Sequence, residues 1–585
     1  MKRTTPFDIP ELMSEIGSNL PAKDLASCAR VSRGWNDSFT RPLYKSVVLS
    51  KDGVSWESFK KYKYFVKYFT LKRSAYQGPS AGSIREEGIS SILVDSNVAC
   101  LDLSYNSIQP EAWLALAEEL KTTSTLTTLN LSNNKMKGLD VQALAEALKT
   151  SSTITTLNLG INRIRDTGCQ ALGRALKTNS SLTRLDLSCN LIGDKGVQTL
   201  FEALKTNSTL AILDLRGNKI EDAGARLLSE ALRANLSLTS LDLAFNYIND
   251  PGVQALSEAL KDNSTLTTLD VGYNKMNGEG IQALSEALKA NSTLTTLDVR
   301  YNKMNGEGIQ ALSEALKRNS TLTALMLDGC SIMDEGAQTL SEALKINSAL
   351  TTLSLSGNQI SSAGAKALSK ALEANSTLAT LCLGLNNIGR HGAKVLAKAL
   401  KTNLTLATLS LPGNVIGSKG VKALAETLKT NSALTTLSLW GNVIGVDGAK
   451  ALSDALKTNS TLTALHLDCN QIGDRGVKAL ANALKTNFTL TTLQLNSNAI
   501  GDHGAKALAE ALKTNSTVAT LNLGSNKIGD DGAKALAEAL KTNSTVAALD
   551  LQYNPIESDG AKVLAAALKT NSTVTISGVS GLQKI

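Results

Sequence analysis

Five aspartates recur every 28 residues and form the most regular set of groups that could bind a partner: Asp186, Asp214, Asp242, Asp270 and Asp298. Within three positions of them stand Arg216, Phe245, Tyr273, Arg300 and Tyr301. Aromatic and arginine side chains among carboxylates are typical of protein-binding hot spots, and an acidic stripe favours a basic partner segment. The alternative is that Leu-Asp-Leu is simply the usual sequence of the strand in each repeat. The carboxylates would then form hydrogen bonds with neighbouring segments of the chain. The sequence leaves both interpretations open.

A second group departs from the consensus in three successive units: Trp440, His466, Asp468 and Gln494. Trp440 stands where other units carry Gly, Ser or Arg, and an exposed tryptophan favours a binding role. Met326 and Asp328 lie between the two groups and could extend either one. We therefore predict a target-binding surface that includes Asp214, Asp242, Phe245, Asp270, Tyr273, Asp298, Arg300, Tyr301, Trp440, His466 and Asp468.

The sequence offers no set of residues for catalysis. Its histidines are far apart, because His391 and His503 occupy the same position four units from each other and His466 lies in another position. A metal site or a catalytic triad requires such groups to converge. There is also no G-x-x-x-x-G-K-[ST] loop for phosphate binding. We expect no catalytic residue, no metal and no cofactor, so the chain is predicted not to be an enzyme.

A column of asparagines sets the register of these groups. The column consists of Asn106, Asn134, Asn162, Asn190, Asn218, Asn246, Asn274, Asn302, Asn358, Asn386, Asn414, Asn442, Asn470, Asn498, Asn526 and Asn554, with Cys330 in the one remaining place. These are 17 positions at a constant spacing of 28 residues. The surrounding pattern L-x-x-L-x-L-x-x-N/C-x-I/L resembles the leucine-rich repeat, and a period of this size indicates a solenoid.

One unit illustrates how the repeat should fold. Leu185–Leu187 alternates apolar and polar residues, which predicts a strand with one buried face. The column asparagine is expected to bond the backbone of adjoining turns, and the thiol of Cys330 can replace it as a weak donor. Asp194 is a good N-cap for a helix over Val197–Lys205, which places leucines on one face. Asn207 suits a left-handed closing position.

Helices in every unit and a uniform unit length make the chain resemble the ribonuclease-inhibitor-like leucine-rich-repeat proteins. That resemblance implies an α/β horseshoe with a parallel β-sheet on the concave face and helices on the convex face. The candidate binding residues stand four, two and one positions before each asparagine, on the concave side. We assign residues 98–575 to this solenoid of 17 repeats and residues 576–585 to a C-terminal tail, with a last strand at Val574–Ile576.

The first 49 residues do not follow the repeat. They contain the order I-P-E-L-x-x-E-I-x-x-x-L-P-x-x-D-L-x-x-x-x-x-V-S-R-x-W followed by Pro-Leu-Tyr, which resembles the F-box, a three-helix motif. The alternative is a helical cap that only covers the end of the solenoid. The resemblance implies binding of the Skp adaptor, and the residues that match the packing positions of the motif are Pro10, Ile16, Leu20, Leu25, Val31 and Trp35.

Residues 50–97 bridge the two parts and contain degenerate repeats. We predict strands at Val47–Leu49 and Phe69–Leu71 and a helix over Ile84–Leu93.

Composition restricts the possible partners and compartments. The chain has 60 basic and 52 acidic residues, a net charge of +8 that is spread over many repeats and indicates a solvated surface, not a nucleic-acid site. Seven cysteines without a C-x-x-C pair fit a reducing compartment. There is no apolar run for a signal peptide or a membrane span. We expect a cytoplasmic or nuclear protein without membrane or nucleic-acid partners.

Together the two parts resemble F-box proteins of the leucine-rich-repeat class. The resemblance implies a substrate-recognition subunit of a Skp-cullin-F-box-type E3 ubiquitin ligase, in which the F-box binds the Skp adaptor and the concave face binds a protein target. One alternative is a non-catalytic scaffold or inhibitor of the ribonuclease-inhibitor-like class. Another is a Ran-type GTPase-activating protein, although those carry an acidic C-terminal tail and residues 577–585 contain no acidic residue.

Overall fold

The structure is a computed structural model of the chain. It describes residues 46–49, 63–71, 83–84, 89, 92–94, 96–571 and 573–579. The predicted F-box helices, and with them Pro10, Ile16, Leu20, Leu25, Val31 and Trp35, lie outside the described residues. The chain divides into two units, Met1–Lys275 and Met276–Ile585, and each is described by itself.

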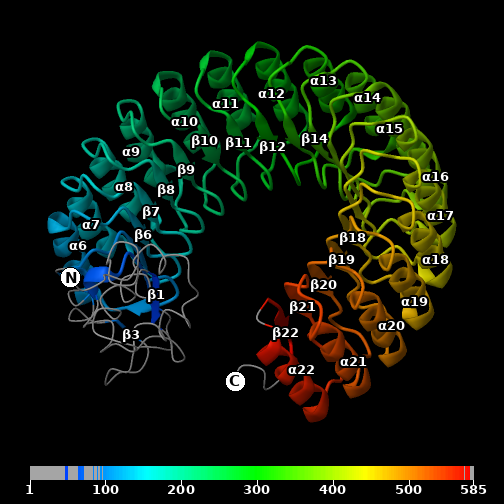
Figure 1. The fold of residues 1–585 in the computed structure, drawn as a ribbon. Helices are drawn as coiled ribbons and strands as arrows, with labels where there is room; N and C mark the ends of the chain where they lie inside the picture. The colour runs from blue at the N-terminus through cyan, green and yellow to red at the C-terminus, as the bar shows by residue number, and fades with distance from the viewer. Residues whose placement is uncertain are drawn as a thin grey trace, which may run out of the picture. The chain divides into compact units, whose positions relative to one another are not determined.

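Unit 1 alternates short parallel strands with helices (Figure 1). Its main strands are β1 (Ser46–Leu49), β2 (Tyr68–Leu71), β4 (Cys100–Asp102), β6 (Thr128–Asn130), β7 (Thr156–Asn158), β8 (Arg184–Asp186), β9 (Ile212–Asp214), β10 (Ser240–Asp242) and β11 (Thr268–Asp270). Its helices are the 3-10 turn η2 (Lys63–Phe65), α6 (Pro110–Thr122), α7 (Gly138–Leu148), α8 (Arg165–Leu176), α9 (Asp194–Leu204), α10 (Asp222–Ala234) and α11 (Asp250–Asp262). The short strands β3 (Ser83–Ile84) and β5 (Ser107–Ile108) pair separately.

Unit 2 repeats the same alternation. Its strands are β12 (Thr296–Asp298), β13 (Ala324–Met326), β14 (Thr352–Ser354), β15 (Thr380–Cys382), β16 (Thr408–Ser410), β17 (Thr436–Ser438), β18 (Ala464–His466), β19 (Thr492–Gln494), β20 (Thr520–Asn522), β21 (Ala548–Asp550) and β22 (Thr575–Ser577). Its helices are α12 (Gly278–Ala290), α13 (Gly306–Leu316), α14 (Met333–Leu344), α15 (Ser362–Ala374), α16 (Gly389–Leu400), α17 (Gly417–Leu428), α18 (Gly445–Leu456), α19 (Gly473–Leu484), α20 (Asp502–Leu512), α21 (Asp530–Leu540) and α22 (Ser558–Thr570).

Within each unit the strands lie on the inner, concave side and the helices on the outer side (Figure 1). The strands pair in parallel without a register shift; Leu241 of β10, for example, faces Leu213 of β9 and Leu269 of β11. The middle leucine of each such strand is buried while its flanking residues remain partly exposed, as an alternating pattern requires. The predicted leucine-rich-repeat fold is confirmed in both units.

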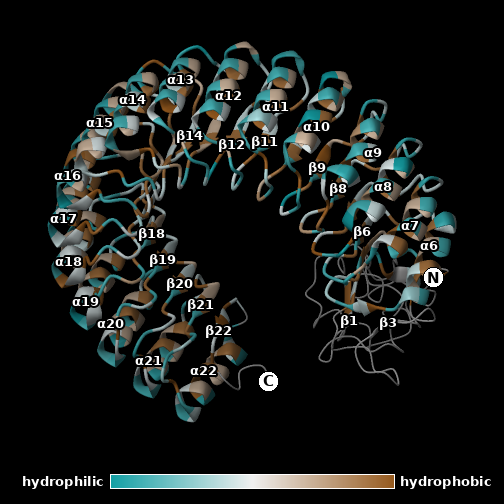
Figure 2. Cartoon of the chain, turned by 180° about the vertical axis from the view of Figure 1, so that it is seen from behind, coloured by the Kyte–Doolittle hydropathy of each residue, from teal (hydrophilic) through white to brown (hydrophobic). Residues whose placement is uncertain are grey.

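The helices are amphipathic and bury their apolar faces against the strands. In α9 the predicted set Leu200, Ala203 and Leu204 is buried, and in Figure 2 the helices show hydrophobic and hydrophilic colours on different sides. A fully buried leucine contributes roughly 1.5 to 3 kcal/mol, and neighbouring turns supply the cover. Each turn therefore depends on its neighbours for stability.

The asparagine column forms the predicted ladder. Asn386 donates from Nδ2 to the carbonyls of Leu355, 31 residues earlier (2.9 Å), and Leu383 (3.0 Å). Its Oδ1 accepts the backbone N–H groups of Asn358 and Ile360 in the preceding turn, both at 2.9 Å. One asparagine side chain thus provides hydrogen-bond partners for backbone N–H and C=O groups that are buried between adjacent turns.

Cys330 takes the donor role in its own turn, as predicted. Its Sγ lies 3.4 Å from the carbonyl oxygen of Val299, the acceptor that an asparagine would use. Burial raises the pKa of this thiol to about 12, so it remains protonated and able to donate. The ladder continues with a weaker bond at this place.

The predicted N-cap role of Asp194 is wrong. Helix α9 has Gly193 as its N-cap and no side-chain cap. The Asp194 carboxylate instead accepts the N–H of Glu221, the N-cap residue of the next helix, at 2.8 Å. Asp222 repeats this arrangement with the N–H groups of Asn249 (2.8 Å) and Gly252 (3.1 Å). The carboxylate therefore caps the following helix, because parallel stacking places that helix end beside it.

Asn207 also differs from its prediction, because it does not adopt a left-handed backbone. Its Nδ2 donates to the carbonyls of Leu176 (2.9 Å) and Asn179 (3.0 Å) in the preceding turn, and its Oδ1 accepts the N–H of Leu210 (2.9 Å). The asparagines at this position form a second ladder at the helix ends.

At the N-terminal side, the strands predicted at Val47–Leu49 and Phe69–Leu71 are present as β1 and β2, which pair in parallel. The last predicted strand is β22, which pairs with β21. The helix predicted from Ile84 is wrong at its start, because Ile84 belongs to strand β3.

Candidate functional site

The acidic stripe of unit 1 consists of Asp186, Asp214, Asp242 and Asp270. These aspartates face one another in register on β8 to β11. Each accepts a hydrogen bond from the backbone N–H two residues later, at 2.8 to 2.9 Å. These hydrogen bonds hold each carboxylate against the backbone of its own turn, and the stripe repeats about every 4.8 Å across the sheet.

The ionised form of Asp214, in the middle of the stripe, is electrostatically unfavourable. Burial from water raises the pKa of its carboxyl to about 6. The backbone N–H of Arg216 opposes this rise, whereas the charges of Asp242 and Asp186 add to it. A cationic group placed on the stripe would favour the ionised form and thereby gain binding free energy.

Asp214→Asn should stabilise the protein at pH 7 and lose this advantage in acid. Between about pH 4 and pH 6, Asp214 is protonated in the folded state and ionised in the unfolded chain. The free energy of unfolding of the wild-type protein therefore falls as the pH rises through this window. Because the carboxyl is partly exposed, we expect a gain of about 1 kcal/mol at pH 7. Hydrogen exchange of peptides that contain Arg216, whose N–H bonds to Asp214, measures the gain at pH 4 and pH 7 against the wild-type chain. The exposed Asp262→Asn is the control, and a gain at pH 4 as large as that at pH 7 would contradict this assignment.

An aromatic stack borders the acidic stripe. The rings of Phe245 and Tyr273 are parallel, with centroids 3.8 Å apart and an interplanar angle of 12°, and the Cζ of Arg216 lies 4.8 Å from the centroid of Phe245. Phe245 is 41% exposed. Its backbone is left-handed (φ 54°), a conformation that costs a non-glycine residue roughly 1–2 kcal/mol, and Gly217 takes the equivalent position in the preceding turn. The stack presents a rigid aromatic and cationic surface on the concave side of unit 1.

The candidates at the start of unit 2 are arranged differently. Asp298 is only 7% exposed, and its Oδ2 lies 2.6 Å from Nη2 of Arg300. Its charge is therefore largely satisfied within the chain. Tyr301 is exposed and its ring packs against Gly329. Asp328 accepts hydrogen bonds from the Oγ of Ser354 and the N–H of Ser356 (2.7 Å), both in the next turn.

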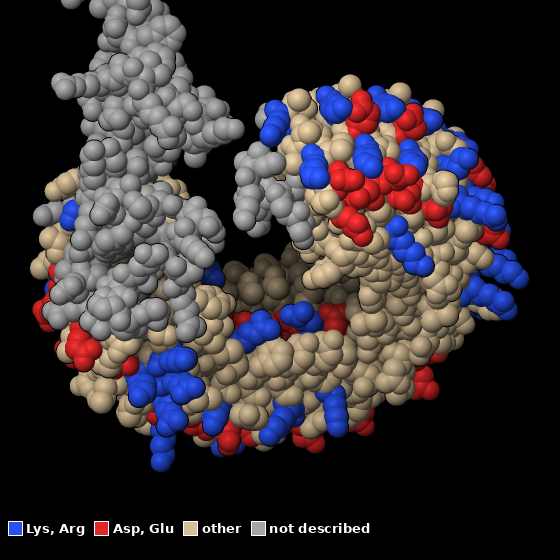
Figure 3. Space-filling model, turned by 90° about the horizontal axis from the view of Figure 1, so that it is seen from below, with Lys and Arg blue, Asp and Glu red and all other residues tan. Residues whose placement is uncertain are grey.

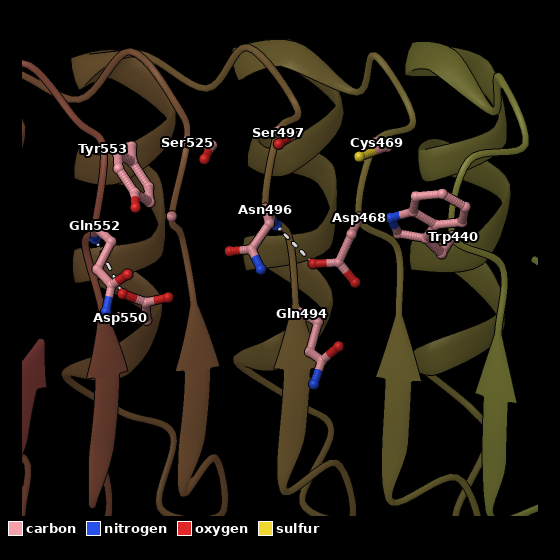
Figure 4. A pocket seen from close by; sticks show the side chains of 11 residues that line it. Trp440, Asp468, Cys469, Gln494, Asn496, Ser497, Ser525, Asp550, Gln552 and Tyr553 are labelled. Carbon is pink, nitrogen blue, oxygen red and sulfur yellow. Dashed lines mark hydrogen bonds between the residues drawn. The ribbon is translucent and has the colours of Figure 1, made fainter. Parts of the chain in front are cut away.

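A groove lies further along unit 2, and we call it the Trp440 groove. It has a volume of about 480 Å³ and is lined by Trp440, Asp468, Cys469, Gln494, Asn496, Ser497, Gly524, Ser525, Asp550, Gln552 and Tyr553. Figure 4 shows Asp468 beside Trp440 and a hydrogen bond from the backbone N–H of Asn496 to Asp468, which measures 2.9 Å. Burial raises the pKa of Asp468.

The structure thus brings together three of the four residues in the second predicted group. Trp440, Asp468 and Gln494 line the groove, and His466 on β18 does not. The sequence analysis missed Asn496, Gly524, Asp550 and Tyr553. They stand four, two or one positions before Asn498, Asn526 or Asn554, so extending the concave positions over the next turns would have found them.

The outer surface carries charges of both signs. Figure 3 shows basic and acidic side chains interspersed on the face in view. Several form ion pairs within one helical turn, such as Lys261 with Glu258 and Lys345 with Glu342, each at 2.6 Å. Exposed pairs of this kind contribute little to stability and keep the helices solvated.

The described part of the chain contains neither a metal-binding cluster nor a membrane-spanning helix. No three His, Cys, Asp or Glu side chains there are grouped closely enough to hold a metal ion. None of the helices described is long and apolar enough to span a membrane.

Known protein families match both parts of the chain. An F-box-like model matches residues 10–50, a leucine-rich-repeat model matches residues 514–537 and 542–565, and the TMOD/LMOD leucine-rich domain matches residues 116–227. The chain is thus a leucine-rich-repeat protein with an F-box-like domain at its N-terminus, a combination typical of non-catalytic protein-interaction adaptors. The model described as the MHP1/HER1/GIP3 LRR domain matches residues 192–498, more than half of the chain. The chain belongs to this family.

Solved structures resemble the chain at low sequence identity. A chain of the mouse RP105/MD-1 complex is 15% identical, with a TM-score of 0.47, over 92% of this chain and 97% of that one. An internalin (inlF) from Listeria monocytogenes is 19% identical, with a TM-score of 0.35, over 69% of this chain and 88% of that one. No curated protein matches the sequence significantly.

Proposed function

We propose that this chain is the substrate-recognition subunit of a Skp-cullin-F-box-type E3 ubiquitin ligase. The observation that supports the proposal most is the F-box-like match at residues 10–50, on the same chain as a leucine-rich-repeat array with a binding-type concave surface. Pro10, Ile16, Leu20, Leu25, Val31 and Trp35 all lie within that match. In this proposal their apolar side chains pack the Skp adaptor or support the surface that does.

The target would bind the concave side. In unit 1 the acidic stripe and the stack of Phe245 and Tyr273 offer charge and exposed aromatic area, and in unit 2 the Trp440 groove does so. Such surfaces supply affinity through a few well-packed aromatic and charged contacts. Asp298 is buried and its carboxylate already pairs with Arg300, so we expect it to contribute little to target binding.

Catalysis would reside in the partner subunits of the ligase. The chain holds the target near the ubiquitin-transferring enzyme, so its contribution to the reaction is proximity. The chain itself is then not an enzyme and needs no cofactor. We place the complex in the cytoplasm or nucleus, in agreement with the reducing compartment that the cysteine pattern favours.

Co-purification of the full chain with a recombinant Skp adaptor tests the proposal. We expect a stable 1:1 complex that survives size-exclusion chromatography at micromolar concentration. Separate elution of a folded chain and a folded adaptor would contradict the proposal and favour a scaffold or inhibitor without a ligase role. Stimulated GTP hydrolysis by Ran in the same preparation would favour the GTPase-activating alternative.

A further inference from the structure

The Trp440 groove has a floor built from one position of five successive turns. The residues two positions before each ladder asparagine are Trp440, Asp468, Asn496, Gly524 and Gln552, and all of them line the groove. Gly524 is the only one of these without a side chain, and it leaves a gap in the floor. The exposed side chains of Trp440 (43%) and Tyr553 (83%) stand near opposite ends of the groove (Figure 4).

Two acceptor oxygens converge on the gap at Gly524. A Cβ atom placed on this glycine would lie 3.0 Å from Oδ1 of Asn496 and 3.1 Å from Oδ2 of Asp550. The other oxygen of Asp550 is occupied, because it accepts the N–H of Gln552 (3.0 Å) and the Oγ of Ser577 (2.9 Å). Oδ1 of Asn496 is fully buried and has no hydrogen-bond partner. Leaving a buried acceptor unpaired is unfavourable, so a donor that reaches this oxygen from the groove adds to the affinity.

The charge of the groove indicates what kind of donor fits. Its described lining includes the carboxylates of Asp468 and Asp550 and no lysine or arginine. Trp440 and Tyr553 can add cation–π attraction for a positive group near their ring faces. An anionic or purely apolar ligand would gain neither of these interactions, so the groove is complementary to a cation with several N–H donors.

We propose that the Trp440 groove is a subsite for an arginine side chain in an extended segment of the protein target, with the guanidinium over Gly524. Two acceptors on different sides of one point match the planar guanidinium, whose N–H groups point outward in several directions, better than a lysine ammonium. Five turns at about 4.8 Å span about 19 Å, which an extended segment of about six residues covers. That the occupant is a protein target rests on the proposed function. The geometry and charge of the groove do not depend on it.

Binding of short peptides to the full chain tests this subsite. The probes are six-residue peptides with capped ends, composed of alanine and glycine except for one central arginine, lysine, citrulline or glutamate, and fluorescence anisotropy reports their affinity at low salt. We expect the arginine peptide to bind at least about tenfold more tightly than the citrulline peptide, which has nearly the same shape but no charge, and more tightly than the lysine peptide. Equal affinities for arginine and citrulline, or a preference for glutamate, would overturn the proposal.

Variants locate the guanidinium. Gly524→Ala places a methyl group in the gap without a left-handed backbone to strain, and it should weaken arginine binding at least about tenfold. Gly160→Ala, at the same position of a turn in unit 1, is the matched control and should leave the affinity unchanged. Asp550→Asn should weaken binding and Asn496→Asp should strengthen it. Full affinity in folded Gly524→Ala and Asp550→Asn proteins would overturn the assignment, and circular dichroism checks that each variant folds.

These outcomes are independent of the adaptor. Arginine-peptide binding without a complex with the Skp adaptor would support the subsite and contradict the ligase role. A stable adaptor complex without arginine preference would support the ligase role and remove the subsite.

Discussion

Asn386→Ala is expected to destabilise the turns around it by at least about 3 kcal/mol. The substitution removes five hydrogen bonds, three donated by Nδ2 and two accepted by Oδ1, and leaves buried backbone groups of two turns unpaired. The amides of Asn358 and Ile360, which bond Oδ1, report the loss directly. Their hydrogen exchange, measured by mass spectrometry on peptides that contain them, should accelerate at least about 100-fold.

The neighbouring residue supplies the control for this experiment. Asn387 is exposed, and Asn387→Ala should change stability by less than about 0.5 kcal/mol. Hydrogen exchange is preferable to a single unfolding midpoint, because a long repeat array need not unfold in one cooperative step. Unchanged exchange at Asn358 and Ile360 in the Asn386→Ala protein would mean that the ladder does not hold the turns together.

Leu20→Glu and Trp35→Ala should each weaken binding of the Skp adaptor at least about 100-fold. The F-box resemblance implies that these apolar side chains pack against the adaptor or support the residues that do. A charge at Leu20 would have to be desolvated in the interface, and truncation of a tryptophan anchor commonly costs 2 kcal/mol or more. Isothermal titration of the full-length variants with the adaptor measures the change.

Leu139→Glu is the matched control for these variants. Leu139 in α7 is 82% exposed, so a charge there removes little buried apolar area and should leave adaptor affinity unchanged. A comparable loss of affinity in all three proteins would indicate a general folding defect. Unchanged affinity in Leu20→Glu and Trp35→Ala proteins would show that the adaptor does not use the F-box surface.

Much of the fold could be predicted from periodicity, because each turn obeys the same local constraints. The spacing of leucines and asparagines predicted strands such as β8, helices such as α9 and the backbone ladder of Asn386. The errors concern partners that only stacking reveals. Asp194 has the residue type of an N-cap, but parallel stacking places the end of α10 beside it, and Asn207 uses its amide to reach the preceding turn instead of adopting a left-handed backbone.

The candidate site was less predictable, since its properties arise between turns. Asp298 and Asp214 occupy the same strand position, yet an arginine two residues later pairs with Asp298 (2.6 Å), whereas Arg216 lies over Phe245. Trp440 was noticeable because it is unusual in its column. Asn496 and Gly524 are ordinary residues in their own turns, and they acquire a shared role only through the position of Asp550 in the next turn.

Crosslinking of the full chain in cell extract, read by mass spectrometry, tests most directly whether one chain couples a Skp adaptor to a bound target. The account predicts adaptor crosslinks to lysines of residues 1–50, such as Lys23. It predicts target crosslinks to Lys219 and Lys275, which follow Asp214 and Asp270 of the acidic stripe by five residues in the same turns. Absence of the adaptor from residues 1–50, or target crosslinks confined to helix lysines such as Lys398, would contradict it.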